Sequence, residues 1–333
     1  MEGCRNQTLH PFFIHESLLM KRFFKRLAWV VLSLFVVLNI VIAFHAWKFT
    51  HFYDEGGRRN KLPEQMSTGE KMKIIFFGVR IAKSVIRNHP TVPYETVSLR
   101  TAAGLKLEGW WIPAPSAVGT VILFHGYNGN KGSLFPEAGR FRQLGYNTFL
   151  LDFRAHGNSE GFTCSVGYKE AEDVKLAWDY IKKKGNQPVI LWGVSMGAAA
   201  ILKAVPEYGL TPQKLILQCP FATLTDAVKS RMRAVHLPPT PLSQLVAFWG
   251  GVEQGFPAHR FKPENYARQI HMPVLYFYGQ QDIRVTPAET QQVFSHLASA
   301  QKKLYIFPNA GHQSFCGKDA DAWMKEVTAF LQH

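Results

Sequence analysis

The residues best suited to covalent chemistry in this chain lie in the pentapeptide Gly193–Gly197 (GVSMG). The apolar run Pro188–Trp192 before it predicts a buried strand, and the run Ala198–Ala204 after it predicts a helix. A serine between two glycines at such a junction forms a nucleophile elbow, because the glycines permit a sharp turn that lifts the hydroxyl above the sheet edge. We therefore predict that Ser195 is a nucleophile and not part of an incidental Gly-Ser turn.

A serine hydroxyl needs a base to take its proton, and the base needs a partner to orient it. Asp282 follows the strand-like run Pro273–Gly279, and His312 follows the strand-like run Lys303–Phe307. Serine, aspartate and histidine occur in the chain order that a nucleophile elbow requires. An aspartate in a loop is more commonly a turn former or a helix cap, but the joint order favours Asp282 and His312 as the partners of the serine.

A site for the oxyanion is expected where the strand-like run Thr120–Phe124 passes into the glycine-rich segment 125–132. One donor should be the backbone N–H of Met196, the residue after the nucleophile, and we assign the second to Tyr127. The alternative is an ordinary flexible loop between a strand and a helix. His125 is expected to brace this loop, because it precedes the serine in the chain and is therefore not placed as the base.

The segment 152–161 (DFRAHGNSEG) follows another strand-like run, Asn147–Leu151. Its many polar residues could indicate a metal or phosphate site, but we favour a structural turn whose side chains hydrogen-bond one another. His156 lies in this turn and, like His125, precedes the serine. The sequence has no HExxH motif, paired CxxC motif or Walker-type spacing, so no metal or nucleotide cofactor is expected.

Taken together, the segments GVSMG, HGYNGN, DFRAHGNSEG, GQQD and AGH resemble the α/β-hydrolase superfamily. The similarity spans about residues 94–333 and is closest to serine-aminopeptidase-like and monoacylglycerol-lipase-like single-domain serine hydrolases, many of them esterases. It implies an α/β-hydrolase fold with a mostly parallel eight-stranded sheet flanked by helices. It also implies a site in which Ser195 is the nucleophile, Asp282 and His312 are its partners, and Tyr127 and Met196 are the oxyanion donors. The turn differs from that of most relatives in one detail, since Ala155 replaces a glycine.

The N-terminal part of the chain contains an uncharged apolar run at residues 27–44. As a helix this run would be about 27 Å long, close to the hydrocarbon thickness of a bilayer. We predict a single-pass membrane helix at residues 27–47, with Trp47 and Lys48 at one interface. An uncleaved signal-anchor is favoured over a signal peptide, because the charged region before the run is long and no A-x-A cleavage site ends it.

The distribution of basic residues predicts the orientation of this helix. Four of them precede the run: Lys21, Arg22, Lys25 and Arg26. They favour a cytoplasmic N-terminal segment, residues 1–26, and a catalytic domain on the far side of the membrane, periplasmic or extracytoplasmic. The asymmetry is modest, because Arg58, Arg59 and Lys61 follow the run.

Residues 48–93 are expected to form a linker and an amphipathic helix. Four basic residues between positions 71 and 87 fall on one arc of a helical wheel: Lys73, Arg80, Lys83 and Arg87. Such a helix could lie on a lipid surface, but we favour a role in covering the core of the catalytic domain, residues 94–333.

A cap is expected at about residues 221–270, between two strand-like runs. Apolar residues recur there at near-helical spacing, namely Leu242, Leu245, Val246, Phe248, Trp249 and Val252. The apolar side of this helix could bind an acyl chain, although such stripes more often pack onto the domain below. The cap therefore suggests a hydrophobic substrate without establishing one.

The composition is typical of a globular protein, with 47% hydrophobic and 19% charged residues. The net charge of +14 is scattered and accompanies no nucleic-acid motif, so anionic lipid headgroups are the expected counter-surface and no nucleic-acid partner is predicted. A solvated basic surface is the alternative. Four cysteines are too few for a disulfide scaffold. Cys4 precedes the span, and one disulfide among Cys164, Cys219 and Cys316 is left open.

The expected reaction is hydrolysis of a carboxylic ester through an acyl-enzyme on Ser195, with a small-molecule or lipid ester as substrate. A peptidase, a thioesterase or an acyltransferase would use the same triad. A non-catalytic, membrane-anchored binding module with this fold is the alternative from another class. The sequence predicts no oligomeric state.

Overall fold

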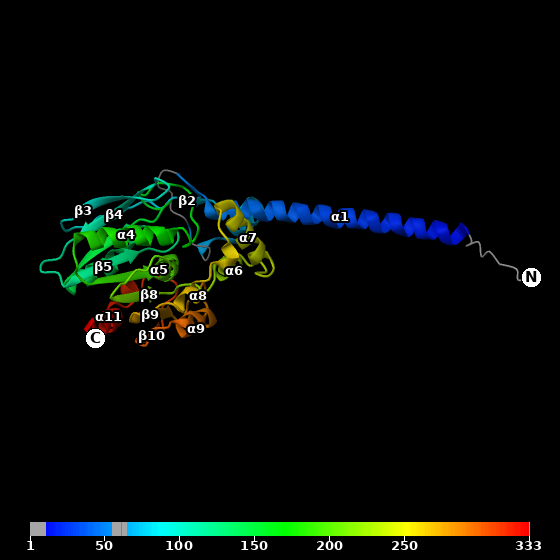
Figure 1. Cartoon of the computed structure of the whole chain (residues 1–333). Helices are drawn as coiled ribbons and strands as arrows, with labels where there is room; N and C mark the ends of the chain where they lie inside the picture. Colours follow the sequence, from blue (N-terminus) through cyan, green and yellow to red (C-terminus); the bar gives the residue numbers. More distant parts are fainter. Residues whose placement is uncertain (1–10, 55–60, 62–64, 333) are drawn as a thin grey trace, which may run out of the picture.

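The computed structural model describes residues 11–54, 61 and 65–332. Cys4, Arg58, Arg59 and residues 1–10 of the predicted N-terminal segment therefore lie outside the described residues. The described chain consists of a long N-terminal helix and a domain built around one large sheet (Figure 1).

The large sheet has eight strands in the order β10-β9-β8-β7-β5-β6-β4-β3. All neighbouring pairs are parallel except β3–β4 and β4–β6. The strands are β3 (Glu95–Arg100), β4 (Lys106–Ile112), β5 (Gly119–Phe124), β6 (Tyr146–Leu151), β7 (Val189–Val194), β8 (Lys214–Gln218), β9 (Val274–Gly279) and β10 (Lys302–Phe307). The predicted mostly parallel, eight-stranded sheet is confirmed.

The strands in the middle of the sheet are buried along their whole length, as in β5, β8 and β9. Parallel strands covered by helices need apolar side chains on both faces, which explains their continuous apolar runs. The flanking helices are α3 (Phe135–Gln143), α4 (Glu170–Lys184), α5 (Met196–Glu207), α9 (Pro287–His296) and α11 (Ala320–Gln332). Among them α3 and α11 meet through the rings of Phe141 and Trp323.

The strands β5, β7, β9 and β10 run in the same direction, so their carboxyl ends lie at one edge of the sheet. The residues that directly follow these strands include Tyr127, Ser195, Asp282 and His312. Loops at this edge are where α/β sheets place their ligand sites. The topology therefore gathers the predicted site residues from four separate parts of the chain.

The N-terminal helix α1 (Pro11–Thr50) extends away from the sheet domain (Figure 1). Its segment Met20–Thr50 is long and apolar enough to cross a membrane, and the rest of the molecule leaves most of that segment uncovered. A core helix of a globular domain would instead be buried. Only the end of α1 enters the domain, where Ile42, Ala46 and Thr50 are buried.

The segment after α1 differs from the prediction. The short strand β1 (Phe52–Tyr53) pairs with β2 (Ile81–Ala82), and the helix α2 (Thr68–Phe77) lies between them in the chain. The helix predicted across residues 71–87 is wrong beyond Phe77, because Gly78 adopts a φ of 74° and ends it. The predicted covering role is wrong for α2, since none of its residues is buried. The residues after α2 do cover the core, because Ile81 is buried in it and Val79 and Ile86 pack against it.

A short helical cap lies between β8 and β9, as predicted. It comprises α6 (Leu224–Ala234), α7 (Leu242–Gln254), the 3-10 turn Ala258–Arg260 and α8 (Pro263–Ala267). The helix α7 packs beside the domain end of α1 (Figure 1), where the indole N–H of Trp249 donates to Asn39 Oδ1 at 3.0 Å. The apolar stripe of the cap therefore packs partly against the N-terminal helix.

The cysteines form no disulfide among the described residues. Cys164, Cys219 and Cys316 are all free and buried, so the disulfide left open by the sequence is not formed among these three.

Candidate active site

Ser195 occupies a strained turn between β7 and α5. Its backbone has φ 53° and ψ −114°, a conformation that a residue with a side chain rarely adopts, and its N–H donates to Gln218 O at 2.8 Å. The two flanking glycines are required by space. A Cβ on Gly193 would lie 2.7 Å from Ala198 N, and a Cβ on Gly197 would lie 2.5 Å from Phe124 O. The strand, turn and helix predicted around Ser195 are present.

Met196 is the first residue of α5. Its backbone N–H has no carbonyl one turn earlier within the helix to bond to, and it lies at the positive end of the helix dipole. A developing negative charge beside Ser195 is therefore met by a helix N-terminus, which is a natural place to bind an anion.

Asp282 and His312 are joined by a hydrogen bond. His312 Nδ1 donates to Asp282 Oδ2 at 2.7 Å. The other carboxylate oxygen, Oδ1, accepts the backbone N–H groups of Arg284 at 2.7 Å and Val285 at 2.9 Å. Because Nδ1 carries the proton in this bond, Nε2 is the ring nitrogen left to accept one. The arrangement fixes the imidazole of His312 so that Nε2 is suited to accept a proton.

The carboxylate of Asp282 is stabilised in its ionised form. Burial alone would raise its pKa, but the hydrogen bond and the charge interaction with His312 and the two backbone N–H groups lower it more. The net pKa of Asp282 lies below its usual value. Asp282 therefore remains negative at neutral pH and can stabilise a positive imidazolium on His312.

The loop that carries His312 is held from two sides. Gln218 Nε2 donates to Gln313 O at 2.7 Å, and Ser314 Oγ donates to Glu137 Oε1 at 2.5 Å. The loops after β9 and β10 also approach each other closely, because a Cβ on Gly279 would lie 2.5 Å from Ala310 O. These contacts fix the backbone around the imidazole.

Tyr127 lies in the loop after β5. Its hydroxyl donates to Phe49 O at 2.5 Å, and its ring stacks on the Phe49 ring with centroids 5.1 Å apart. The side chain thus points toward the end of α1, which leaves its backbone N–H as the group that can serve at the site. Burial raises the pKa of the Tyr127 hydroxyl well above its usual value, so it is a hydrogen-bond donor at neutral pH.

Two buried histidines hold the same loop. His125 Nε2 accepts the backbone N–H of Phe153 at 3.1 Å, so its Nδ1 donates to Gly126 O at 2.8 Å. His156 Nε2 accepts the backbone N–H of Asn128 at 3.1 Å. Burial lowers the pKa of His125 to about 4 and that of His156 to about 3, so both rings are neutral at pH 7. Their ring nitrogens are used in bracing the backbone, as expected for His125.

The polar turn at residues 152–161 is a hydrogen-bonded structural unit. Asp152 accepts the backbone N–H groups of Lys131 at 2.6 Å and Asn158 at 2.9 Å, and it pairs with the Lys131 ammonium group. Arg154 pairs with the buried Asp173. Ala155 has a φ of 64°, which explains why glycine suits this position in similar turns.

One cavity of about 400 Å³, counted with space open to solvent, brings the predicted residues together. Ser195, Met196, Tyr127 and His312 all line it, and Asp282 is bonded to His312. The carboxylate thus contacts the predicted base, while the predicted nucleophile and both predicted oxyanion residues line the same cavity.

The residues that line this cavity and that the sequence did not predict include Phe49, Arg231 and Arg284. Arg284 lies two positions after Asp282, so a search of the residues next to the predicted triad could have identified it. Arg231 lies in the cap, whose fold over the site has no local signature. Phe49 follows the predicted membrane helix 27–47 and lies in the segment predicted as a linker, so the sequence pattern gave no reason to place it at the site.

A metal ion would find few ligands here. Among the described residues, the one close group of candidate ligands is Cys219, Asp282 and His312, whose ligand atoms lie within 4.8 Å of one another. Two of these atoms already share the hydrogen bond between Asp282 and His312, and burial raises the pKa of the Cys219 thiol well above its usual value. A protonated, buried thiol is a poor ligand, so the group is better suited to proton transfer.

Comparison with known proteins agrees with this geometry. A model described as serine aminopeptidase, S33, matches residues 115–251, and one described as the dienelactone hydrolase family matches residues 234–330. The protein YqkD of Bacillus subtilis is 28% identical over 237 residues, which cover 70% of this chain and 77% of YqkD. The lysophosphatidylserine lipase ABHD12 of Danio rerio is 26% identical over 211 residues, covering 59% of this chain and 51% of the lipase.

The solved structure of the esterase Pf2001 from Pyrococcus furiosus is also similar. It superposes with a TM-score of 0.63 at 25% identity, and the match covers 75% of this chain and 97% of the esterase. The two family models together match residues 115–330, which include the strands β5 to β10.

Proposed function

Because the chain belongs to the α/β-hydrolase superfamily and is an esterase-type or lipase-type hydrolase, we propose that it cleaves carboxylic esters through an acyl-enzyme on Ser195. One observation carries this proposal. The Asp282–His312 hydrogen bond of 2.7 Å holds a base at the cavity that Ser195 lines, beside a helix N-terminus. A nucleophile, an oriented base and oxyanion donors are the groups that acyl transfer needs.

In this mechanism His312 Nε2 takes the Ser195 hydroxyl proton as the oxygen attacks the ester carbonyl carbon. The N–H groups of Met196 and Tyr127 bind the resulting oxyanion. His312 then gives the proton to the leaving alcohol as the C–O bond breaks, which leaves the acyl group on Ser195. A water molecule, deprotonated by His312, hydrolyses this acyl-enzyme. Asp282 stays ionised throughout and stabilises the imidazolium.

We propose a lipid-like ester as the substrate. Two features support an ester with an anionic part: Arg231 and Arg284 line the nucleophile cavity, and the relative from Danio rerio is named a lysophosphatidylserine lipase. A guanidinium group binds phosphate and carboxylate groups well. The description of the matching model as a serine aminopeptidase favours amide cleavage as the second candidate.

We also propose that α1 anchors the protein in a membrane. Its exposed apolar segment Met20–Thr50 supports this role. The burial of Ala46 and Thr50 in the domain argues against a leader that is later removed, because its loss would uncover part of the site. The proposed orientation has a cytoplasmic N-terminus. Protease added to spheroplasts, whose outer membrane is permeabilised and whose inner membrane is intact, should then degrade the sheet domain; full protection would reverse the orientation.

The proposal is tested by Ser195→Ala in the full-length chain. Labelling by a fluorophosphonate probe should disappear, and turnover of 4-nitrophenyl butyrate should fall by roughly 10⁴–10⁶-fold. Ser295→Ala, at an exposed position on α9, is the matched control and should keep both. Unchanged labelling of a folded Ser195→Ala protein would falsify the assignment.

A substrate panel separates the candidates. Purified protein is given monoacylglycerols, lysophosphatidylglycerol, thioesters and aminoacyl amides at equal concentration. We expect the highest kcat/KM on the lipid esters. A preference for the aminoacyl amides would establish the peptidase instead, and no burst of product with activated esters would support a binding module.

A further inference from the structure

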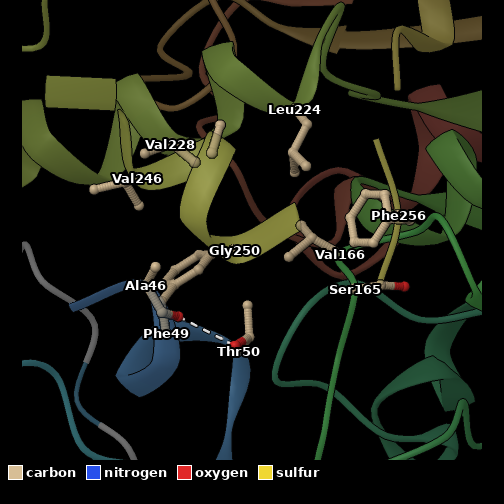
Figure 2. Close-up of a pocket in the computed structure, with 11 residues that line it drawn as sticks. Ala46, Phe49, Thr50, Ser165, Val166, Leu224, Val228, Val246, Gly250 and Phe256 are labelled. Carbon is tan, nitrogen blue, oxygen red and sulfur yellow. Dashed lines mark hydrogen bonds between the residues drawn. The ribbon is translucent and has the colours of Figure 1, made fainter. Parts of the chain in front are cut away.

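A second cavity lies beside the nucleophile cavity and is walled in part by the N-terminal helix. Its volume is about 320 Å³, counted with space open to solvent. Figure 2 shows Ala46 and Phe49 of α1 on one side and Val166 and Phe256 on the other. The cap completes it, with Leu224 and Val228 from α6 and Val246, Ala247 and Gly250 from α7.

The lining of this cavity is suited to an apolar ligand. Its two hydroxyl groups are both engaged within the protein. Thr50 Oγ1 donates to Ala46 O at 3.1 Å (Figure 2), and Ser165 Oγ donates to Glu170 Oε2 at 2.6 Å. The other lining side chains are hydrocarbon or aromatic. Transfer of a hydrocarbon chain from water into such a space is favourable, because the chain has no hydrogen bonds with water to give up.

The two cavities are neighbours, because Phe49 and Val166 line both of them. A ligand that passes these two side chains would have its apolar end beside α1 and its other end at Ser195.

The walls of the second cavity are also the part of the domain closest to the proposed membrane. The helix α7 runs beside α1 as far back as Asn39, whose Oδ1 accepts from Trp249. Asn39 is roughly 16 Å along the helix from Thr50, within the predicted span 27–47. On α7 the side chains of Phe248 and Val252 are 52% and 55% exposed. The cap helix therefore presents apolar side chains at the depth of the membrane surface.

We propose that the second cavity binds the acyl chain of a lipid ester, which enters from the bilayer between α1 and α7. The anchor is then a wall of the substrate site as well as an attachment. The ester carbonyl lies at Ser195, the chain passes Phe49 and Val166, and its distal carbons lie against Ala46 and Val246. This inference rests on the proposed esterase function and adds to it the class of substrate and its route.

Two valine variants on the same helix test the acyl site. Val246 lines the cavity, whereas Val252 is exposed and does not. Full-length protein in vesicles of phosphatidylcholine and phosphatidylglycerol is given 4-nitrophenyl acetate and 4-nitrophenyl laurate, with rates normalised to fluorophosphonate-labelled enzyme. Val246→Trp should lower the laurate-to-acetate ratio of kcat/KM at least tenfold, and Val252→Trp should leave it within twofold of the original. An unchanged ratio in Val246→Trp overturns the acyl site.

A second measurement covers the case in which Val246→Trp does not fold. The unaltered protein is labelled on Ser195 with a long-chain fluorophosphonate that carries a photoreactive diazirine near the chain end. After illumination, mass spectrometry should find the crosslink in peptides containing residues 46–50 or 246–250. Crosslinks confined to other parts of the chain overturn the proposal.

The two proposals fail in different ways. Failure of the esterase function appears as absent labelling and absent acetate hydrolysis in the unaltered protein. Failure of the acyl site appears as a labelled, active enzyme in which Val246→Trp does not change the laurate-to-acetate ratio, or in which the crosslinks lie outside residues 46–50 and 246–250.

Discussion

Glu137 is a buried carboxyl group attached to the loop of the proposed base. Its Oε1 accepts from Ser314, two residues after His312, and its Oε2 has no hydrogen-bond partner among the described residues. Burial raises its pKa from 4.5 to about 7. Because this carboxyl group resists ionisation in the folded protein, we expect the stability of the fold to depend on pH.

The sign of that dependence follows from the pKa. Unfolded, Glu137 ionises near pH 4.5; folded, it holds its proton to about pH 7. Between these values the folded state binds more protons, so the free energy of unfolding falls as pH rises from about 5 to about 8. The full difference corresponds to about 3 kcal/mol. Urea unfolding of the protein and of Glu137→Gln should diverge by an amount of this order over that interval.

The comparison with Glu137→Gln isolates this carboxyl group. The depressed pKa values of His125 and His156 destabilise the fold below pH 6.5, but they act equally in both proteins. Glu95→Gln, which alters only an exposed carboxylate, should track the original protein at every pH. Parallel curves for the original and Glu137→Gln would show that Glu137 ionises normally in the fold.

The individual residues of the site were predictable to different degrees. Ser195, Asp282 and His312 each follow a strand in a fixed chain order, so local pattern and order locate them. Phe49 and Arg231 line the same cavity, but their places depend on how α1 and the cap fold back over the sheet edge. Contacts between segments that are distant in the chain do not produce a periodic pattern in the sequence of either segment, so they could not be predicted.

At the scale of elements, the junction of β7 and α5 leaves no room for a side chain at Gly197. A Cβ there would lie 2.5 Å from Phe124 O and 2.8 Å from His125 O, both backbone atoms that cannot rotate away. We expect Gly197→Ala to destabilise the fold by about 2 kcal/mol or more and to lower fluorophosphonate labelling.

Gly139→Ala is the matched control for this substitution. A Cβ on Gly139 would meet nothing within 4 Å, and the residue lies inside the helix α3. Alanine should therefore be neutral or stabilising there, by up to about 1 kcal/mol. Thermal unfolding of both variants gives the comparison, and equal melting temperatures would contradict the close packing at the junction.

The helix α2 shows why the boundaries of elements were harder to predict than their existence. Basic and apolar residues recur with helical period through position 87, but Gly78 stops the helix and Ile81–Ala82 pairs with Phe52–Tyr53 instead. A strand partner almost thirty residues earlier in the chain outweighs a local pattern. The central strands had no such competitor, and they begin and end within one or two residues of their apolar runs.

The packing of α7 on α1 is close enough to be captured by a disulfide. A Cβ built on Gly250 would lie 4.0 Å from Ala46 Cβ, within the range of disulfide-bonded pairs. We introduce Ala46→Cys and Gly250→Cys together in a Cys4→Ser background, and we expect these two cysteines to form a disulfide under mild oxidation. After proteolysis between the two sites, the disulfide keeps the fragments together and is seen as a shift on non-reducing gels. Ala46→Cys with Gly139→Cys should not form a disulfide, and absence of the first crosslink would refute the contact.

At the scale of the whole molecule, the sheet domain is not separable from the end of its N-terminal helix. Phe52 and Ala46 are buried, and Phe49 lines both cavities. A chain that begins at Asp54 should have a free energy of unfolding lower by about 3 kcal/mol or more. This loss corresponds to a decrease of about 6 °C or more in melting temperature. Calorimetry in one detergent should compare the shortened chain with a chain that begins at Met20, which keeps all three residues. Equal melting temperatures would show that α1 is only a tether.

The hydroxyl of Tyr127 donates to the carbonyl of Phe49, and the two rings stack. The loop of the proposed oxyanion donor is thereby joined to the helix that we propose as the membrane anchor. A helix longer than the local hydrocarbon layer tilts to match it. Tilting α1 would displace Phe49, and through it the loop beside Ser195. If the proposed anchor and activity hold, the reaction rate should therefore depend on the thickness of the surrounding bilayer.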